Sequence, residues 1–280
     1  MKVLFSTGAL YGLPFLLAFR LAAAAGFDGV ELVLDPLAIL AGPAAVLRTS
    51  ARFRQPIVAL HPSLFGLPGL RGPCQLARQL ASWARAIEPE LLVLHPPRCG
   101  KQATTEQEFD WTLELLRESL DAKVRITVEN TAVFLPQDRL NPYVWPPNVA
   151  AFARARQLGM TFDTTHVAST GLEVISAYEG VAAQVEHVHL SDYRVPKPLL
   201  DRPSLDTYCK HHQMPGVGEL DVPGFLAALR AHGYDGAITV EVSPLAVPLW
   251  RWRKTVHALA AVVSTIKACW TCEANHDTAC

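Results

Sequence analysis

Short apolar runs alternate with longer amphipathic stretches along nearly the whole chain. A run such as 91–94 (LLVL) is apolar at every position, which is typical of a parallel strand covered on both faces. Several of the longer stretches begin with Pro, or after Asp or Asn, and stop at Gly, as helices do. The strands are expected to begin at Val3, Val30, Ile57, Leu91, Arg125, Met160, Val185 and Ala237, and the helices to cover 14–25, 43–52, 73–87, 106–121, 148–158, 173–184, 222–232 and 249–268.

Eight β-then-α units in one chain predict an α/β fold, a (β/α)8 TIM barrel, as a single domain. An open doubly wound sheet is the alternative, but Gly-rich phosphate fingerprints are missing after the early strands. Two long connections, 134–147 and 193–220, are candidate lids, with surface decoration as the other interpretation. We expect the barrel to cover 1–268 and a Cys- and His-containing tail to cover 269–280.

Composition narrows the class of protein. Half of the residues are hydrophobic, which excludes a disordered chain. Lys and Arg total 25 against 26 Asp and Glu, and this balance disfavours, without excluding, a nucleic-acid partner. No apolar run is long enough for a membrane span, and Gly12, Pro14 and Arg20 interrupt the segment that resembles a signal peptide. We therefore expect a cytoplasmic protein without a membrane partner, and leave open a homo-oligomer.

The six cysteines are too scattered for a small disulfide scaffold. Four residues near the C-terminus nevertheless have zinc-ligand chemistry, namely Cys269, Cys272, His276 and Cys280. They stand alone after the last predicted helix, without a matching Gly turn. A loose tail is therefore favoured over a folded zinc site.

Six successive predicted strands end in an acidic residue or a histidine. His61 follows the third strand, His95 the fourth, and Glu129 the fifth. Asp163 follows the sixth, with His166 three residues further on. The seventh and eighth strands bring His187, His189 and Glu241. In a barrel these ends converge on one mouth, which is where TIM-barrel active sites lie.

Carboxylates held together at the ends of buried strands need a compensating cation. Glu129, Asp163 and Glu241 together with His189 form a set of N and O ligands. This set suits a divalent ion such as Mn²⁺, Zn²⁺ or Co²⁺, with Mg²⁺ as an alternative. Separate ion pairs with strand-end Lys and Arg are the other interpretation, but few basic residues stand at matching positions.

At these residues the chain resembles the xylose-isomerase-like TIM-barrel superfamily, which includes sugar isomerases and epimerases and the endonuclease IV family. The resemblance implies that Glu129, Asp163, His189 and Glu241 bind metal, that Glu129 and Glu241 also transfer protons, and that His166 contacts a substrate oxygen. The matching pieces span nearly the whole chain and are 28–32 (DGVEL), 61–62 (HP), 95–96 (HP), 128–131 (VENT), 163–166 (DTTH), 187–192 (HVHLSD), 215–221 (PGVGELD) and 233–236 (GYDG), which leads into Glu241.

The endonuclease branch adds zinc ligands after the third and fourth strands and an Asp-x-His pair in the seventh loop. His61 and His95 match the first two, whereas the pair reads Cys209-Lys210-His211 here, so Cys replaces Asp. Additional metal ligands are thus expected among His61, His95, His166 and His211. The glycine loop at 216–225, the GYDG piece and the near-neutral charge favour the sugar branch.

The expected function is a divalent-metal-dependent isomerase or epimerase that acts on a sugar, sugar phosphate or related polyol by proton transfer through an enediolate. The expected partner is a small carbohydrate. The alternatives are a zinc-dependent abasic-site DNA endonuclease and a non-catalytic carbohydrate-binding barrel. We expect His187 to be a structural, hydrogen-bonded residue, and Glu31 either to reach the mouth or to form an ion pair. The candidate substrate-binding residues are His166, His61, His95, Arg194 and Glu31.

Overall fold

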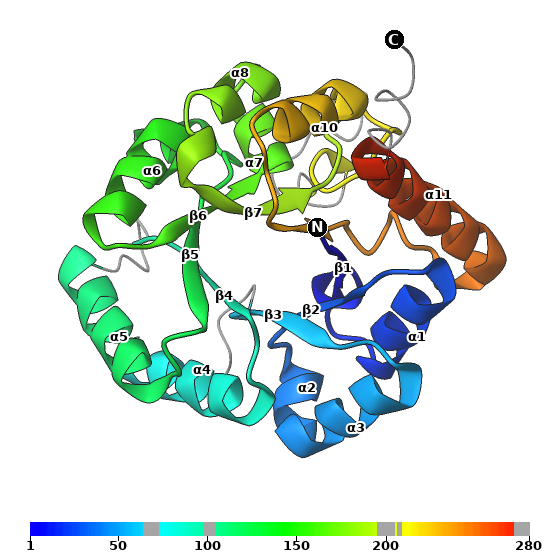
Figure 1. The fold of residues 1–280 in the computed structure, drawn as a ribbon, viewed down its shortest axis with the longest axis horizontal. Helices are drawn as coiled ribbons and strands as arrows, with labels where there is room; N and C mark the ends of the chain where they lie inside the picture. The colour runs from blue at the N-terminus through cyan, green and yellow to red at the C-terminus, as the bar shows by residue number, and fades with distance from the viewer. Residues whose placement is uncertain (64–72, 98–104, 195–204, 206–208, 272–280) are drawn as a thin grey trace, which may run out of the picture.

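The computed structural model describes residues 1–63, 73–97, 105–194, 205 and 209–271. Eight parallel strands form a closed barrel in chain order, because β1 pairs with both β2 and β8 (Figure 1). The predicted (β/α)8 architecture is therefore confirmed. The strands are β1 Val3–Ser6, β2 Gly29–Val33, β3 Ile57–His61, β4 Leu91–Leu94, β5 Arg125–Glu129, β6 Gly159–Asp163, β7 Val185–Leu190 and β8 Ala237–Val240.

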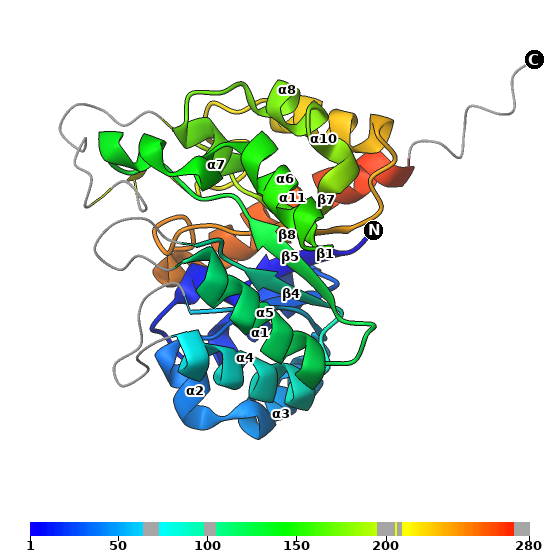
Figure 2. The ribbon, with the colours of Figure 1, turned by 90° about the vertical axis from the view of Figure 1, so that its left-hand side faces the viewer.

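The helices form a ring outside the strands (Figure 1). From the side, α6, α7, α8 and α10 lie on one side of the strands and α1 to α4 on the other (Figure 2). No helix in the described ranges is both long and apolar enough to cross a membrane. The helices are α1 Leu16–Ala25, α2 Pro36–Ala41, α3 Pro43–Phe53, α4 Pro73–Ile87, α5 Glu106–Ser119, α6 Pro146–Ala155, α7 Thr164–Ser169, α8 Val174–Glu179, α10 Val222–Ala231 and α11 Trp252–Thr271.

Some predicted helices have different bounds. Short helices α2 and α7 were not predicted, because six residues are too few to show a helical period. The expected helix at 173–184 is α8 followed by the 3-10 turn Ala182–Gln184. The candidate lid at 134–147 contains two further 3-10 turns, Pro136–Leu140 and Pro142–Val144.

The C-terminal helix α11 continues to Thr271 and includes Cys269. Cys272, His276 and Cys280 lie outside the described residues, as do most residues of 195–208 in the second candidate lid.

Two apolar clusters pack against the strands, a larger one outside the barrel and a smaller one inside it. The larger core packs the outward residues of the strands against the helices, with Phe5, Phe162 and Phe225 among its buried members. A smaller cluster contains strand residues only and occupies part of the barrel interior, formed by Leu4, Val58, Ala59, Leu91, Val93 and Ala237. Most residues of this smaller apolar cluster thus come from β3 and β4.

The rest of the barrel interior is polar, which is unusual for a fold whose interior is dominated by Val, Ile and Leu. Thr127 of β5 and Thr161 of β6 share a hydrogen bond of 2.6 Å between their hydroxyls. His187 is paired with Thr161 in the sheet register, and it forms hydrogen bonds with Glu31 and Thr239, all three being completely buried. These residues form a polar layer below the strand ends.

Candidate metal centre

The strand ends bring four of the predicted residues together. Glu129 ends β5, Asp163 ends β6, His189 lies on β7 and Glu241 directly follows β8. One ligand atom from each lies within 4.8 Å of the others, and all four side chains are buried. The convergence expected from a barrel is therefore present.

His189 is at the centre of this group. Its Nδ1 lies 3.0 Å from Glu129 Oε1, 2.8 Å from Glu241 Oε2 and 3.9 Å from Asp163 Oδ2. The residues alternate along β7, so His187 and His189 point to the same side of the strand, into the barrel. One imidazole nitrogen thus faces three carboxylates.

The charges of the group are tightly linked. Burial favours the neutral form of Glu129 and is the largest single influence on it, but His189, His61 and His95 together outweigh burial and hold the pKa of Glu129 well below 4.5. Burial likewise opposes a charge on His189, but Glu31, Glu241 and Glu129 raise its pKa well above 6.5. A positive charge at Nδ1 therefore stabilises the carboxylates, and a divalent ion can supply the same charge.

Asp163 supports this interpretation independently. Its Oδ1 accepts a hydrogen bond from the backbone N–H of His166 at 2.7 Å. Its Oδ2 is buried and has no hydrogen-bond partner among the described residues. Burial raises the pKa of Asp163, an effect that His166 and His212 only partly offset. A buried carboxylate oxygen without a donor, beside an imidazole and two carboxylates, fits a divalent cation.

A second group contains His61 and His95. The Nε2 atoms of both lie 3.3 Å from Glu129 Oε2. His61 Nδ1 lies 2.7 Å from the carbonyl oxygen of Pro62, to which it can only donate, so Nε2 is directed at Glu129. His61 is 1% exposed and His95 is 23% exposed, so His95 faces the mouth more openly.

A third group contains His166 and His212 with Asp163. His166 Nδ1 donates to the Asn130 carbonyl at 2.7 Å, which places the lone pair of this neutral tautomer on Nε2. His212 Nδ1 lies 4.0 Å from Asp163 Oδ2. Its backbone has a φ of 51°, a left-handed conformation that is uncommon for a residue other than glycine.

His212, rather than the predicted His211, joins this group. His211 stacks on Phe134 at 4.8 Å and contacts Tyr193 edge to face at 5.4 Å between ring centres. Burial, together with His212, lowers the pKa of His211 to about 2. The only signal for His212 in the sequence was its adjacency to His211, and the structure directs His212 toward Asp163 whereas His211 stacks on Phe134.

The remaining predicted residues are Glu31, His187 and Arg194, and none of them belongs to the three groups above. Glu31 is completely buried and accepts hydrogen bonds from His187 and His189, so it forms the ion pair rather than reaching the mouth. His187 is hydrogen-bonded below the site, as expected. The Arg194 side chain is exposed, and its backbone N–H donates to the Lys210 carbonyl. In the described part of the chain, Arg194 belongs to none of the ligand groups.

The glycine loop after β7 is organised by Asp192. This completely buried carboxylate accepts hydrogen bonds of 2.8 to 3.0 Å from the backbone N–H groups of Tyr193, Gly216, Gly218 and Leu220. A Cβ at Gly218 would lie 2.3 Å from Asp192 Oδ1, so only glycine fits there. The loop therefore binds a carboxylate of its own chain.

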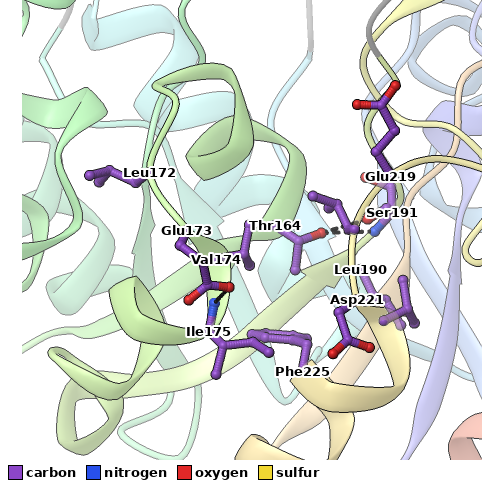
Figure 3. A pocket seen from close by; sticks show the side chains of 12 residues that line it. Thr164, Leu172, Glu173, Val174, Ile175, Leu190, Ser191, Glu219, Asp221 and Phe225 are labelled. Carbon is purple, nitrogen blue, oxygen red and sulfur yellow. Dashed lines mark hydrogen bonds between the residues drawn. The ribbon is translucent and has the colours of Figure 1, made fainter.

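A cavity of about 240 Å³ lies apart from the metal-ligand groups, between α8 and α10 (Figure 3). Of the acidic residues at its edge, Glu173 accepts hydrogen bonds from the N–H groups of Ile175 and Ser176, and Asp221 from that of Gly224. Both carboxylates cap helices, so this cavity is a weaker candidate site than the barrel mouth.

Comparison with known proteins agrees with this architecture. The sequence model described as "Xylose isomerase-like TIM barrel" matches residues 19–259. The uncharacterized protein ML2432 of Mycobacterium leprae (strain TN) is 25% identical over 275 residues, covering 91% of this chain and 93% of that protein.

Solved structures show the same fold. The IOLI protein with a binding zinc atom has a TM-score of 0.71 at 16% identity, covering 97% of this chain and all (100%) of that one. The N-terminal His-tagged D-allulose 3-epimerase from Methylomonas sp., in complex with D-allulose, has a TM-score of 0.68 at 17% identity, covering 96% of each chain. The structural neighbours thus include sugar epimerases.

Proposed function

This chain belongs to the family of xylose isomerase-like TIM barrels, and from that premise we propose that it is a divalent-metal-dependent isomerase or epimerase. The substrate class is a sugar, sugar phosphate or related polyol. The observation that carries the proposal is the group of Glu129, Asp163, His189 and Glu241, whose ligand atoms lie within 4.8 Å of one another. The zinc atom and the D-allulose named for two structural neighbours support the same class of site.

The ion would be held by these four residues and, when bound, would stabilise negative charge on adjacent substrate oxygens. Of the two glutamates, one removes a proton from a substrate carbon as a carboxylate, and the other, in its protonated form, donates a proton of its own to the same or the neighbouring carbon. The Glu241 side chain is 10% exposed and Glu129 2% exposed, so both are shielded from bulk water. Shielding protects the enediolate from unwanted protonation.

The substrate would approach from the side of the two more exposed histidines. His95 is 23% exposed and His166 is 15% exposed, and both lie beside Glu129. Because the neutral tautomer of His166 has its lone pair on Nε2, this nitrogen can accept a hydrogen bond from a substrate hydroxyl. We assign His95 and His166 to orienting the carbohydrate.

The test is a screen of ketoses and their phosphates with Mn²⁺ in D₂O. The proposal predicts deuterium incorporation at the carbon next to the carbonyl, and loss of this incorporation after chelation. Metal binding without deuterium incorporation into any sugar would instead favour a non-catalytic carbohydrate-binding barrel.

A second candidate function is metal-dependent cleavage of DNA at abasic sites. It is favoured by two of the three additional groups, His61 with His95 and His166 with His212, which share Glu129 and Asp163 with the central one. Metal counting and an assay on DNA with an abasic analogue decide between the two functions. One ion per chain favours the sugar enzyme, and three ions together with DNA cleavage would overturn it.

A further inference from the structure

Below the proposed metal centre lies a carboxylate that the proposed chemistry does not use. Glu31 of β2 is completely buried, and its Oε2 lies 3.1 Å from Nε2 of His189. This is the imidazole nitrogen opposite the one that faces Glu129 and Glu241. His189 is therefore held between Glu31 on one side and the metal-ligand group on the other.

Glu31 is itself fixed in place. Its Oε2 accepts a hydrogen bond from His187 Nε2 at 2.9 Å and from Thr239 Oγ1 at 3.3 Å. Thr239 Oγ1 also lies 3.1 Å from His187 Nε2, which closes a small network. Glu31 contacts Nε2 of His189 whereas Glu129 and Glu241 face Nδ1, so the network lies on the far side of His189 from the proposed metal centre and is completely buried there.

This contact has a direct consequence for the tautomer of His189. When His189 donates the hydrogen on Nε2 to Glu31, the lone pair of the neutral ring is on Nδ1. Nδ1 is the nitrogen directed at Glu129, Glu241 and Asp163. A ligating histidine typically donates its other N–H to a carboxylate or carbonyl, which orients the ring and raises its basicity.

We propose that Glu31 is a positioning residue, which orients His189 and holds its Nδ1 lone pair toward the ion. The proposal rests on the proposed function, because it assumes that His189 binds a metal. It assigns Glu31 no contact with substrate. His187 and Thr239 in turn hold Glu31, so the polar layer of the barrel interior is part of the site.

The experiment measures Co²⁺ binding to the full-length protein, using affinity and the visible absorption spectrum of the bound ion. Glu31→Gln preserves the size of the side chain, but its amide can donate to Nε2 as well as accept, so the tautomer is no longer selected. We expect about 10–100-fold weaker Co²⁺ binding and an altered spectrum. A purely structural role for Glu31 would leave the spectrum of the bound ion unchanged.

Two further variants keep the test decisive. Glu31→Asp retains the negative charge but withdraws the oxygens from Nε2, so binding must again weaken and the spectrum must again change. Asp35→Asn is the matched control, because Asp35 is a buried carboxylate four residues further on that caps α2 through Ala38 N–H. Asn caps helices about as well as Asp, so this variant should bind Co²⁺ as the unmodified protein does.

The outcomes separate this inference from the proposed function. Failure of the unmodified protein to bind Co²⁺ would overturn the metal centre itself. Normal binding with an unchanged spectrum in Glu31→Gln would overturn only the role of Glu31. Normal binding in Glu31→Asp with weak binding in Glu31→Gln would show that the charge alone matters, and would also overturn the positioning role.

Discussion

Glu129 and Glu241 come from strands far apart in the chain, yet each places a carboxylate oxygen within 3.0 Å of the same atom, Nδ1 of His189. Two carboxylates that share one partner cannot both be satisfied by a single proton on that atom. The charges of these two glutamates are therefore linked. The arrangement fits the divalent ion proposed above, and these two carboxylates are the groups that we propose for proton transfer.

The two glutamates provide the first prediction. Glu129→Gln and Glu241→Gln each remove a proton acceptor while keeping an oxygen that can bind metal, so turnover should fall by about 10²–10⁴-fold. The two variants should differ in the substrate hydrogen that still exchanges with deuterium, on opposite faces of one carbon or on neighbouring carbons, because each glutamate serves one proton. Glu118→Gln, an exposed change on α5, is the control. Near-native turnover in both site variants would remove the proton-transfer role.

His189 provides the second prediction. His189→Ala removes the nitrogen ligand and leaves three carboxylates facing one another, so metal affinity should be lost. At a metal concentration of 100 times Kd, the unmodified protein should gain about 2.7 kcal/mol of stability, and the variant almost none. Thermal unfolding with and without metal measures the difference. His257→Ala on α11 is the matched control, and unchanged metal stabilisation in His189→Ala would exclude His189 as a ligand.

His95 provides a prediction about the substrate rather than the metal. If His95 orients a carbohydrate hydroxyl, His95→Ala should raise KM by about tenfold, corresponding to one lost hydrogen bond of about 1.4 kcal/mol. The number of bound ions should stay the same, as measured by metal analysis of the purified protein. A loss of one ion per chain in this variant would contradict the assignment and favour a second metal at His61 and His95.

The fourth prediction concerns pH and the metal-free protein. His189 has a pKa raised well above 6.5 because Glu31, Glu241 and Glu129 outweigh the effect of burial, and the pKa values of His61 and His166 are also raised. A raised folded-state pKa gives stability that is fully present below the unfolded pKa and is lost as pH rises through the folded pKa.

The urea midpoint of chelator-treated protein should therefore fall as the pH rises above about 6.5, through the raised pKa values of these histidines. His187 has a lowered pKa, because burial outweighs its hydrogen bond to Glu31, so its contribution is lost only below about 6.5. Metal affinity should rise over the same interval, since the ion competes with a proton for Nδ1. The urea midpoint should depend less on pH in His189→Gln than in the unmodified protein. An equal dependence on pH in this variant would show that His189 does not titrate as expected.

Asp192 provides a stability prediction. Asp192→Ala leaves the N–H groups of four residues without their acceptor, so the free energy of unfolding should fall by at least about 2 kcal/mol. Asp192→Asn keeps one carbonyl oxygen and should lose less. Asp235→Ala, at an exposed position just before β8, is the control. Urea denaturation that ranks Asp192→Ala with this control would show that the glycine loop does not depend on Asp192.

The strands and their terminal residues were predictable because the signal is local. Each strand is a short apolar run, and the residue that follows it is adjacent in the chain. Glu129, Asp163 and His189 could therefore be placed at the mouth once eight units had been counted. The barrel geometry then brings strand ends together whatever their sequence separation.

The contacts below the mouth could not be predicted in this way. Glu31 and His187 are 156 residues apart, and no local sequence pattern predicts the hydrogen bond between them. His212 was missed because the positive φ that turns it toward Asp163 is set by the fold of its loop. The glycine loop matched a family pattern, but its N–H groups contact Asp192, which only the structure shows.

The polar layer inside the barrel has a consequence for protein engineering. Copying only the mouth residues into another (β/α)8 scaffold would place His189 above an interior of Val, Ile and Leu. There Nε2 would have no acceptor, and the ring could rotate or adopt the wrong tautomer. A graft would have to carry Glu31, His187 and Thr239 with it. The smallest set of residues that could be transferred thus includes two layers of the barrel, the residues at the mouth and the polar layer below them.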